Sequence, residues 1–529
     1  MKTTRRSRRP RHGGLALTAG LTATLTVAGL LASGCSAGGP STDVAMAELP
    51  RATPKALASY YGQKLNWRAC GVPGFECATM KAPRDYAKPD AGDVRLAVSR
   101  KRATGGKGGR LGSLLVNPGG PGGSAIGYLQ SYAALGYPEE VRARYDMVAV
   151  DPRGVARSEP VTCLDDREMD AYTQTDTTPD SAAETTRLTT AYKDFGAGCE
   201  KRSGALLAHV STVEAARDMD VLRAALGDEK LAYVGASYGT FLGATYAGLF
   251  PGRVGRLVLD GAMDPSLTAR RMNLDQTAGF ETAFQSFAKD CVARPDCPLG
   301  RKDPADAGKR LKSFFATLDS APIPAGDPGP SGGRELGEAL ATTGVIAAMY
   351  DESAWPQLRD ALSSAMRQRD GSSLLALSDS YYERDGDGRY ANLMYANAAV
   401  NCLDLPPSFR APKDVEAALP AFRKASPVFG EGLAWAAVNC AYWPEEATGR
   451  PHRIEAKGAA PILVVGTTRD PATPYRWAKG LASQLASARL LTYEGDGHTA
   501  YGRGSHCVDE TINTYLLRGK APGTAKRCT

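Results

Sequence analysis

The sequence lacks the ligand patterns that usually mark a zinc site. It contains no Cys-x-x-Cys pair and no His-Glu-x-x-His, and its 529 residues include only five histidines. Structural and catalytic zinc ions are held mainly by Cys and His ligands at such short spacings. The sequence therefore favours chemistry that is carried by side chains without a metal.

A strong excess of charge of one sign is also missing. The net charge is +7, and much of it lies in the first eleven residues, which include Lys2 and five arginines. Because no basic stripe follows, nucleic acid is not expected as a partner. The composition, 43% hydrophobic and 23% charged, is that of a globular chain, and the length suggests more than one compact unit.

The N-terminal cations precede an apolar run over Leu15–Leu31 and then small residues. This order predicts a secretory signal over residues 1–35, whereas a transmembrane anchor is less favoured because the run is short and rich in Thr, Ala and Gly. The segment Ala32-Ser33-Gly34-Cys35 resembles a lipoprotein cleavage site, although Ala32 stands where Leu is usual. Secretion and anchoring to the outer face of the membrane through a lipidated Cys35 both stay open. Paired arginines also allow twin-arginine export, but no full motif follows them.

The cysteine count points to disulfides. Eleven cysteines become an even number once Cys35 is set aside, as expected for an exported chain in an oxidising compartment. Near neighbours along the chain suggest five pairs: Cys70–Cys77, Cys163–Cys199, Cys291–Cys297, Cys402–Cys440 and Cys507–Cys528.

Short apolar runs bounded by Gly, Pro, Asn or Asp alternate with longer helical patterns. Such runs indicate strands that are buried on both faces, as in a parallel sheet. Between Thr212 and Leu226 apolar residues recur at helical spacing, and Ser211 can cap the start. The rhythm predicts an α/β fold with a doubly wound, mostly parallel sheet. The runs are Leu114–Val116, Met147–Val150, Leu231–Val234, Leu257–Leu259, Ile462–Val465 and Leu490–Tyr493.

The rhythm breaks over residues 264–457, which are Ala-rich and mostly helical in pattern, with a Pro/Gly interruption from Pro322 to Gly333. We expect a linker over 36–55, a core in two parts over 56–263 and 458–529, and a helical cap inserted between them. A separate domain unrelated to the active site is the alternative. The cap is favoured because catalytic candidates lie on both sides of the insertion. No internal repeat is apparent.

The segment Gly235-Ala236-Ser237-Tyr238-Gly239 joins a predicted strand to a predicted helix. Gly-x-Ser-x-Gly on a strand-to-helix turn places the serine in a strained conformation with its hydroxyl exposed, and the flanking glycines avoid collisions. The segment predicts Ser237 as a nucleophile. The alternative, a glycine-rich turn with an incidental serine, does not explain its place after a strand.

A serine nucleophile needs a base, and the base needs an acid that orients it. His498 follows the last predicted strand in a Gly-rich loop, whereas the rival His506 neighbours Cys507, and His209 and His452 lack a strand-end context. For the acid, Asp470 closes the strand before that of His498, and Asp260 is the rival at the end of an earlier strand. Asp470 is preferred, and either gives the chain order Ser, acid, His.

A second Gly-rich turn, Asn117-Pro118-Gly119-Gly120-Pro121-Gly122-Gly123, follows the predicted strand Leu114–Val116. Together with the N–H of Tyr238, its backbone N–H groups suit an oxyanion site. A phosphate-binding loop is the competing interpretation, and it fails because no Gly-Lys-Ser/Thr ending follows.

Motifs with chemistry or turn character are spread over nearly the whole predicted exported chain. They are Trp67-Arg68-Ala69-Cys70 with Cys77, Asn117–Gly123, Asp151-Pro152-Arg153-Gly154 with Ser158, Gly235–Gly239, Asn401-Cys402-Leu403-Asp404, Cys440 with Trp443, Asp470-Pro471-Ala472-Thr473-Pro474, and Gly495–His498. In this order they resemble the tripeptidyl aminopeptidases, secreted α/β-hydrolase exopeptidases related to the proline iminopeptidases. One departure stands out: Ala156 replaces a glycine of the family's Asp-x-Arg-Gly-x-Gly-x-Ser pattern, a change expected to affect loop geometry alone.

This resemblance implies a triad of Ser237, Asp470 and His498, with oxyanion donors from the Gly119–Gly120 stretch and Tyr238. It implies an acyl-enzyme reaction without metal or organic cofactor, on the free N-terminus of a peptide substrate. Two alternatives stay open: an esterase or lipase on the same scaffold, and a surface-binding lipoprotein without catalysis. Intact candidates at all three triad positions argue against the second.

Overall fold

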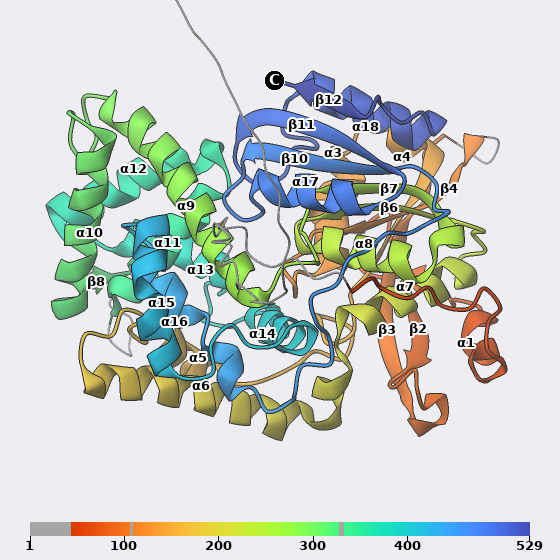
Figure 1. Ribbon diagram of the computed structural model, residues 1–529, viewed down its shortest axis with the longest axis horizontal. Coiled ribbons are helices and arrows are strands. Elements are labelled where there is room, and N and C mark those ends of the chain that lie inside the picture. Colours follow the sequence, from red (N-terminus) through yellow and green to blue (C-terminus); the bar gives the residue numbers. More distant parts are fainter. Residues whose placement is uncertain (1–43, 106–108, 327–332) are drawn as a thin grey trace, which may run out of the picture. The chain divides into compact units, whose positions relative to one another are not determined.

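The computed structural model describes residues 44–105, 109–326 and 333–529 (Figure 1). The predicted signal, Cys35 and the first part of the linker lie outside these residues. A ten-stranded sheet of order β1-β2-β3-β5-β4-β6-β7-β10-β11-β12 runs through the described part. Its strands are β1 (Arg68–Ala69), β2 (Glu76–Pro83), β3 (Asp93–Lys101), β4 (Gly112–Asn117), β5 (Tyr145–Val150), β6 (Leu231–Ala236), β7 (Val254–Asp260), β10 (Ile462–Arg469), β11 (Ala488–Asp496) and β12 (Ala525–Cys528).

The six predicted apolar runs all lie within neighbouring parallel strands, from β5 to β11. The antiparallel strands β2 and β3 were not predicted. In β3 exposed and buried residues alternate at the start of the strand, so it lacks the continuous apolar run that marks the central strands.

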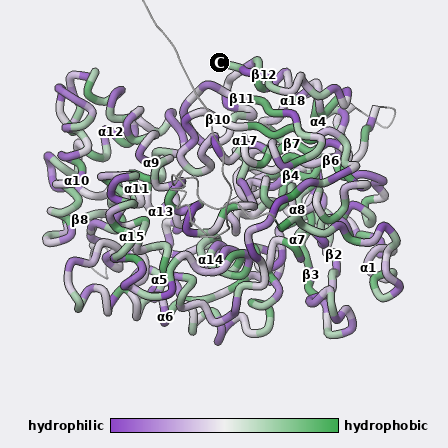
Figure 2. The backbone as a smooth tube through the Cα atoms, in the orientation of Figure 1, coloured by the Kyte–Doolittle hydropathy of each residue, from purple (hydrophilic) through white to green (hydrophobic). Residues whose placement is uncertain are grey.

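Successive residues of the central strands pack on opposite faces of the sheet. Leu115 and Val148 join one hydrophobic cluster, whereas Leu114 and Met147 join another. The first cluster includes residues of the helices α7 (Thr212–Ala225), α8 (Tyr238–Leu249) and α17 (Tyr475–Gln484), and the second those of α2 (Ala125–Tyr128), α4 (Glu139–Arg144) and α18 (His506–Arg518). Figure 2 shows hydrophobic residues along β4, β6 and β7. Strands covered by helices on both sides confirm the α/β-hydrolase fold class.

The region between β7 and β10 contains most of the remaining helices and a two-stranded sheet, β8 (Ile323–Ala325) with β9 (Arg334–Leu336). In Figure 1 helices α9 to α13 gather in one group, and their buried residues form a hydrophobic cluster of their own. The helices here are α9 (Ala269–Val292), α10 (Pro304–Ser320), α11 (Glu338–Met349), α12 (Trp355–Ser363), α13 (Ser372–Tyr382), α14 (Leu393–Asp404), α15 (Pro412–Ala425) and α16 (Gly430–Ala436).

Two packing arrangements cross the expected domain boundaries. Helix α14 packs into the cluster of the main sheet through Tyr395, Val400 and Leu403. Helix α6 (Ala182–Ser203), which precedes the nucleophile in sequence, shares a cluster with α15 and α16. Short helices α1 (Ala58–Tyr61), α3 (Ala134–Gly136) and α5 (Asp166–Thr173) complete the set. None of the helices in the described part of the chain is both long and apolar enough to cross a membrane.

Five disulfides join the described cysteines, and they are the five pairs that the sequence suggested: Cys70–Cys77, Cys163–Cys199, Cys291–Cys297, Cys402–Cys440 and Cys507–Cys528. The bridge between Cys402 and Cys440 closes 38 residues and ties α14 to the segment after α16. Several disulfides fit a protein that folds in an oxidising compartment.

We predict that a thiol-alkylating reagent modifies few cysteines of the exported protein before reduction and ten after it, because the five bridges use ten cysteines. Each bridge restricts the unfolded chain and adds about 2–4 kcal/mol to the free energy of unfolding. Intact-mass measurement checks the count, and denaturation with and without reductant checks the stability. Alkylation of most cysteines without reduction would contradict the pairing.

Candidate active site

Ser237 lies on the sharp turn between β6 and α8, and its backbone is strained. Its φ of 56° and ψ of −124° are values that residues with a side chain rarely adopt. The turn is crowded, because a Cβ added to Gly235 would lie 2.4 Å from the carbonyl oxygen of Gly239. The two glycines of Gly-x-Ser-x-Gly therefore permit a turn that presents Ser237 at the N-terminus of α8.

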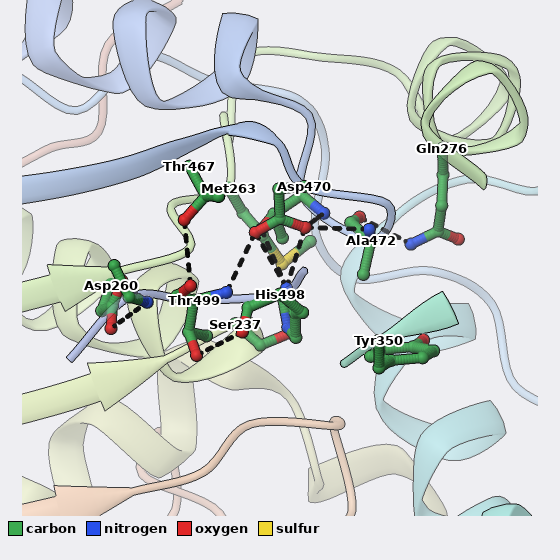
Figure 3. Close-up of polar contacts among 12 residues, drawn as sticks. Ser237, Asp260, Met263, Gln276, Tyr350, Thr467, Asp470, Ala472, His498 and Thr499 are labelled. Atoms are coloured by element: carbon green, nitrogen blue, oxygen red, sulfur yellow. Dashed lines mark hydrogen bonds and ion pairs between the residues drawn. The ribbon is translucent and has the colours of Figure 1, made fainter. Parts of the chain in front are cut away.

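The structure brings His498 and Asp470 together, as Figure 3 shows. His498 Nδ1 lies 2.9 Å from Asp470 Oδ1 and 3.0 Å from Oδ2. His498 follows β11 and Asp470 follows β10, which are neighbouring parallel strands. This geometry fixes one ring nitrogen against the carboxylate and leaves Nε2 to face away from it, as an acid–base pair requires.

The Asp470 carboxylate is buried and held by neighbours besides His498. It accepts the backbone N–H groups of Ala472, Thr473 and Thr499, at 2.9, 2.8 and 3.2 Å, and the Thr473 hydroxyl at 2.9 Å. Thr473 was not assigned a role from the sequence, although an aspartate followed at short spacing by threonine is a common local turn pattern. These bonds stabilise a charged carboxylate away from water.

Asp260, the rival acid, makes no hydrogen bond to His498 among the described residues. Its carboxylate accepts the backbone N–H groups of Ala500 and Tyr501, at 3.0 and 2.8 Å, and burial raises its pKa. Its carbonyl oxygen accepts the N–H of Ser237 at 2.8 Å. Asp260 therefore fastens the loop after His498 and the nucleophile turn rather than the imidazole.

Ser237 and His498 are not hydrogen bonded. Nε2 of His498 is buried and has no hydrogen-bond partner among the described residues. Catalytic hydrogen bonds are often long before substrate binds, so the missing bond does not exclude His498 as the base.

The two glycines that were predicted as oxyanion donors, Gly119 and Gly120, differ in the structure. The N–H of Gly119 donates to Asn117 Oδ1 at 2.9 Å, whereas the N–H groups of Gly120 and Tyr238 donate no hydrogen bond within the described residues. The loop lies against the nucleophile turn, since a Cβ on Gly119 would be 2.9 Å from the Tyr238 nitrogen. Gly120 and Tyr238 are therefore the available donors of the three that were predicted.

Two side chains from other segments, Asp151 and Asn397, support the Gly-rich loop and the helix that follows it. Asp151 accepts the Ser124 hydroxyl and the Ile126 N–H, at 2.8 and 2.9 Å, at the start of α2. Asn397 on α14 donates to the Pro121 carbonyl at 3.0 Å. The Gly-rich loop is therefore held by a residue of the core, Asp151, and by a residue of the region between β7 and β10, Asn397.

Ala156, the departure from the family pattern, has a φ of 44°, in the left-handed region that favours glycine.

The other histidines lie elsewhere. The side chain of His506 is 92% exposed beside Glu510, His209 Nδ1 lies 3.3 Å from Glu214, and His452 Nδ1 lies 2.7 Å from the carbonyl of Arg450. Two groups within the described residues bring possible metal ligands within 4.8 Å of one another, and neither includes a triad candidate: Asp85, His209 and Glu214, and Asp176, Asp319 and Glu338.

Comparisons with known proteins identify the family of the chain. The TAP-like protein family matches residues 426–528, which include Asp470 and His498. Serine protease Hip1 of Mycobacterium tuberculosis is 39% identical over 497 residues, covering 88% of this chain and 91% of its own length. Tripeptidyl aminopeptidase of Streptomyces lividans is 32% identical, covering 88% and 86%. The chain belongs to the tripeptidyl aminopeptidase family of α/β hydrolases.

The same comparisons include a relative named for a different reaction. Carboxylesterase B of Mycobacterium tuberculosis is 38% identical over 524 residues, covering 96% of this chain and 98% of its own length. The named relatives are hydrolases, which makes this chain an enzyme and sets aside a surface-binding lipoprotein without catalysis. Similarity to serine protease Hip1 and to tripeptidyl aminopeptidase supports a serine peptidase.

We predict that Asp470→Asn lowers kcat by about 10⁴-fold, because an amide no longer fixes the tautomer and orientation of His498. Asp260→Asn lowers the free energy of unfolding by about 1–3 kcal/mol, because the new amide NH2 group faces backbone N–H groups that donate to the carboxylate in the wild type. We expect this substitution to lower kcat far less than Asp470→Asn does. Steady-state kinetics and denaturation of both variants check this. A folded Asp260→Asn protein with the larger loss of kcat would assign the acid to Asp260.

Asp404 yields a prediction for stability. It ends α14, and its carboxylate accepts the Thr212 N–H at 2.8 Å and the Thr212 hydroxyl. Burial raises the pKa of Asp404 to about 7, although the bonds from Thr212 act in the opposite direction. The unfolded aspartate loses its proton near pH 4, so between pH 4 and pH 7 the folded state binds more protons and stability falls as pH rises.

Asp404→Asn removes this pH dependence and keeps an oxygen for the Thr212 N–H. We expect its stability relative to the wild type to improve by a few kcal/mol from pH 4 to pH 8. Denaturant unfolding at both pH values measures the change. If the difference in the free energy of unfolding between Asp404→Asn and the wild type is the same at pH 4 and pH 8, the raised pKa of Asp404 is contradicted.

Proposed function

We propose that this enzyme is a serine exopeptidase that releases short peptides, tripeptides in the first instance, from the free N-terminus of peptide substrates. Similarity to the relatives named serine protease and tripeptidyl aminopeptidase supports the substrate class. The observation that carries the chemistry is the constellation of a strained Ser237, a His498–Asp470 pair and the N–H groups of Tyr238 and of the Gly-rich loop that lies against the nucleophile turn. The disulfides support export of the chain.

The reaction follows from these positions. His498 Nε2 takes the proton of Ser237 Oγ as the oxygen attacks the scissile carbonyl, and Asp470 stabilises the imidazolium through Nδ1. The N–H groups of Gly120 and Tyr238 hold the oxyanion of the tetrahedral intermediate. His498 then protonates the leaving amine. Water, activated by the same imidazole, releases the peptide from the acyl-enzyme.

Recognition of a free amine requires a carboxylate, and the region 264–457, which we propose acts as a cap, offers several, among them Glu281, Asp351, Glu352, Asp404 and Glu431. Two of them are ion-paired, Asp351 with Arg503 and Glu431 with Arg423. Asp404 is buried beneath Thr212, and Glu352 is exposed. Glu281 is half-buried, and its hydrogen-bond partners are the neutral side chains of Ser426 and Gln285, at 2.6 and 2.7 Å.

Glu281 also lies on the helix that packs against the catalytic acid loop. On α9, a Cβ added to Gly279 would be 2.3 Å from the Pro471 carbonyl oxygen, and Gln276 donates to the Ala472 carbonyl at 2.8 Å (Figure 3). The neighbouring Phe280 packs against Tyr350, whose ring contacts His498. We therefore propose Glu281 as the partner of the substrate ammonium, because a half-buried carboxylate without a cation gains most from one.

An esterase is the second candidate function, favoured by the relative named Carboxylesterase B. Ester hydrolysis would use the same Ser237, His498 and oxyanion donors. It would not require an amine-binding carboxylate, because a simple ester carries no ammonium group.

We predict that N-acetylation of a peptide amide lowers kcat/KM by about 100-fold, or about 3 kcal/mol, because acetylation removes the charge and leaves the half-buried carboxylate unpaired. Glu281→Gln should lower kcat/KM for the free peptide and leave the acetylated peptide unaffected. Glu352→Gln, which changes an exposed carboxylate, is the matched control.

Matched free and acetylated peptides, with product analysis, provide the measurement, and Ser237→Ala defines the background. Equal kcat/KM values for both peptides would remove the aminopeptidase proposal and leave the serine hydrolase. If Glu352→Gln, but not Glu281→Gln, abolishes the preference for the free peptide over the acetylated one, the amine site is assigned to Glu352.

A further inference from the structure

The C-terminal end of helix α11 meets the loop that carries His498. Tyr350 follows the last residue of α11, and its carbonyl oxygen accepts the backbone N–H of His498 at 2.8 Å. The Tyr350 ring packs edge-on against the imidazole, with centroids 5.4 Å apart and planes at 85° (Figure 3). A helix between β7 and β10 thus contacts the candidate base through both its backbone and a ring.

Arg503 lies across this junction. Its Nη1 donates to the carbonyl oxygens of His498 and Tyr350, at 2.5 and 3.3 Å, and its Nη2 donates to Asp351 Oδ1 at 3.0 Å. The guanidinium packs over Gly497, where an added Cβ would lie 2.5 Å from Nη2. The side chain is only 17% exposed, so this cation is committed to these partners rather than to water.

Elementary electrostatics favours such a cation at this place. The last carbonyl groups of a helix lack partners within the helix and carry partial negative charge, which Arg near a C-terminus stabilises. The planar guanidinium also fixes several acceptors in one geometry, which a Lys ammonium does not. The backbone of His498 is therefore held at both its N–H, by Tyr350, and its C=O, by Arg503.

We propose that Arg503 is a positioning residue for His498: it fastens the end of α11 to the catalytic loop and so keeps the imidazole aligned with Asp470. Arg503 touches no reacting atom. It acts through the backbone of His498 and through Tyr350. The inference rests on the proposed role of His498 as the base, and it adds a structural reason why the inserted helices affect the chemical step.

The direct test is Arg503→Ala. We expect kcat to fall by about 10–100-fold with KM within about twofold, because a small misplacement of a catalytic group is costly to the chemical step. The rate of Ser237 labelling by a fluorophosphonate, which needs the base but no peptide, should fall in parallel. Arg294→Ala is the matched control, because it removes an ion pair with Asp290 on α9 and should leave both rates unchanged.

Two additional measurements separate positioning from general stability. Added methylguanidinium should restore part of the activity of Arg503→Ala, because it can occupy the space of the lost group, and Arg503→Lys should retain part of kcat. Asp351→Ala should lower kcat several-fold, and its effect should not add to that of Arg503→Ala, since both remove one linked contact. Asp351 is half-exposed, so its variant tests the same junction should Arg503→Ala not fold.

Wild-type kcat and labelling rates in folded Arg503→Ala, or in Asp351→Ala where Arg503→Ala does not fold, would overturn the proposal. So would a lower melting temperature accompanied by an unchanged kcat. Failure of the underlying role of His498 as the base would differ, because His498→Ala would then keep its activity. The two outcomes are therefore distinguishable in one set of variants.

Discussion

Two buried carboxylates at the ends of neighbouring strands hold the loop on which the whole site depends. Asp470, after β10, binds the His498 ring and the Thr499 N–H, and Asp260, at the end of β7, binds the N–H groups of Ala500 and Tyr501. A buried carboxylate is costly unless hydrogen bonds satisfy it. The N–H groups of the loop therefore stabilise the two buried carboxylates, and the carboxylates in turn hold the loop in place. The parallel register of β7 and β10 sets the separation between Asp260 and Asp470.

The same constraint explains how the two candidate acids divide their roles. Asp260 ends one central strand, Asp470 directly follows another, and both are almost fully buried, so burial does not distinguish them. The difference is the direction of the loop after β11, which presents a ring nitrogen to Asp470 and backbone N–H groups to Asp260. Asp260 additionally accepts the N–H of Ser237, so one residue links the nucleophile turn to the base loop.

The sequence predicts those features that a local pattern determines. The runs around Leu114 and Ile462 are apolar because helices cover both sheet faces, and Gly235 and Gly239 are required by one crowded turn. Sequence patterns do not reveal contacts between distant segments. The contact of Tyr350 with His498 joins residues almost 150 positions apart, and no motif marks Tyr350.

Three of the helices between β7 and β10 contact the candidate site directly. Helix α14 packs into the main hydrophobic cluster and braces the Gly-rich loop through Asn397, α9 presses on the loop after Asp470, and the end of α11 contacts His498. These three contacts reach, in turn, the proposed oxyanion loop, the proposed acid and the proposed base. A displacement of the helices between β7 and β10 would thus disturb all three, since packed contacts transmit small movements. The residues that we propose carry the chemistry therefore contact the same segment that we propose binds the substrate amine.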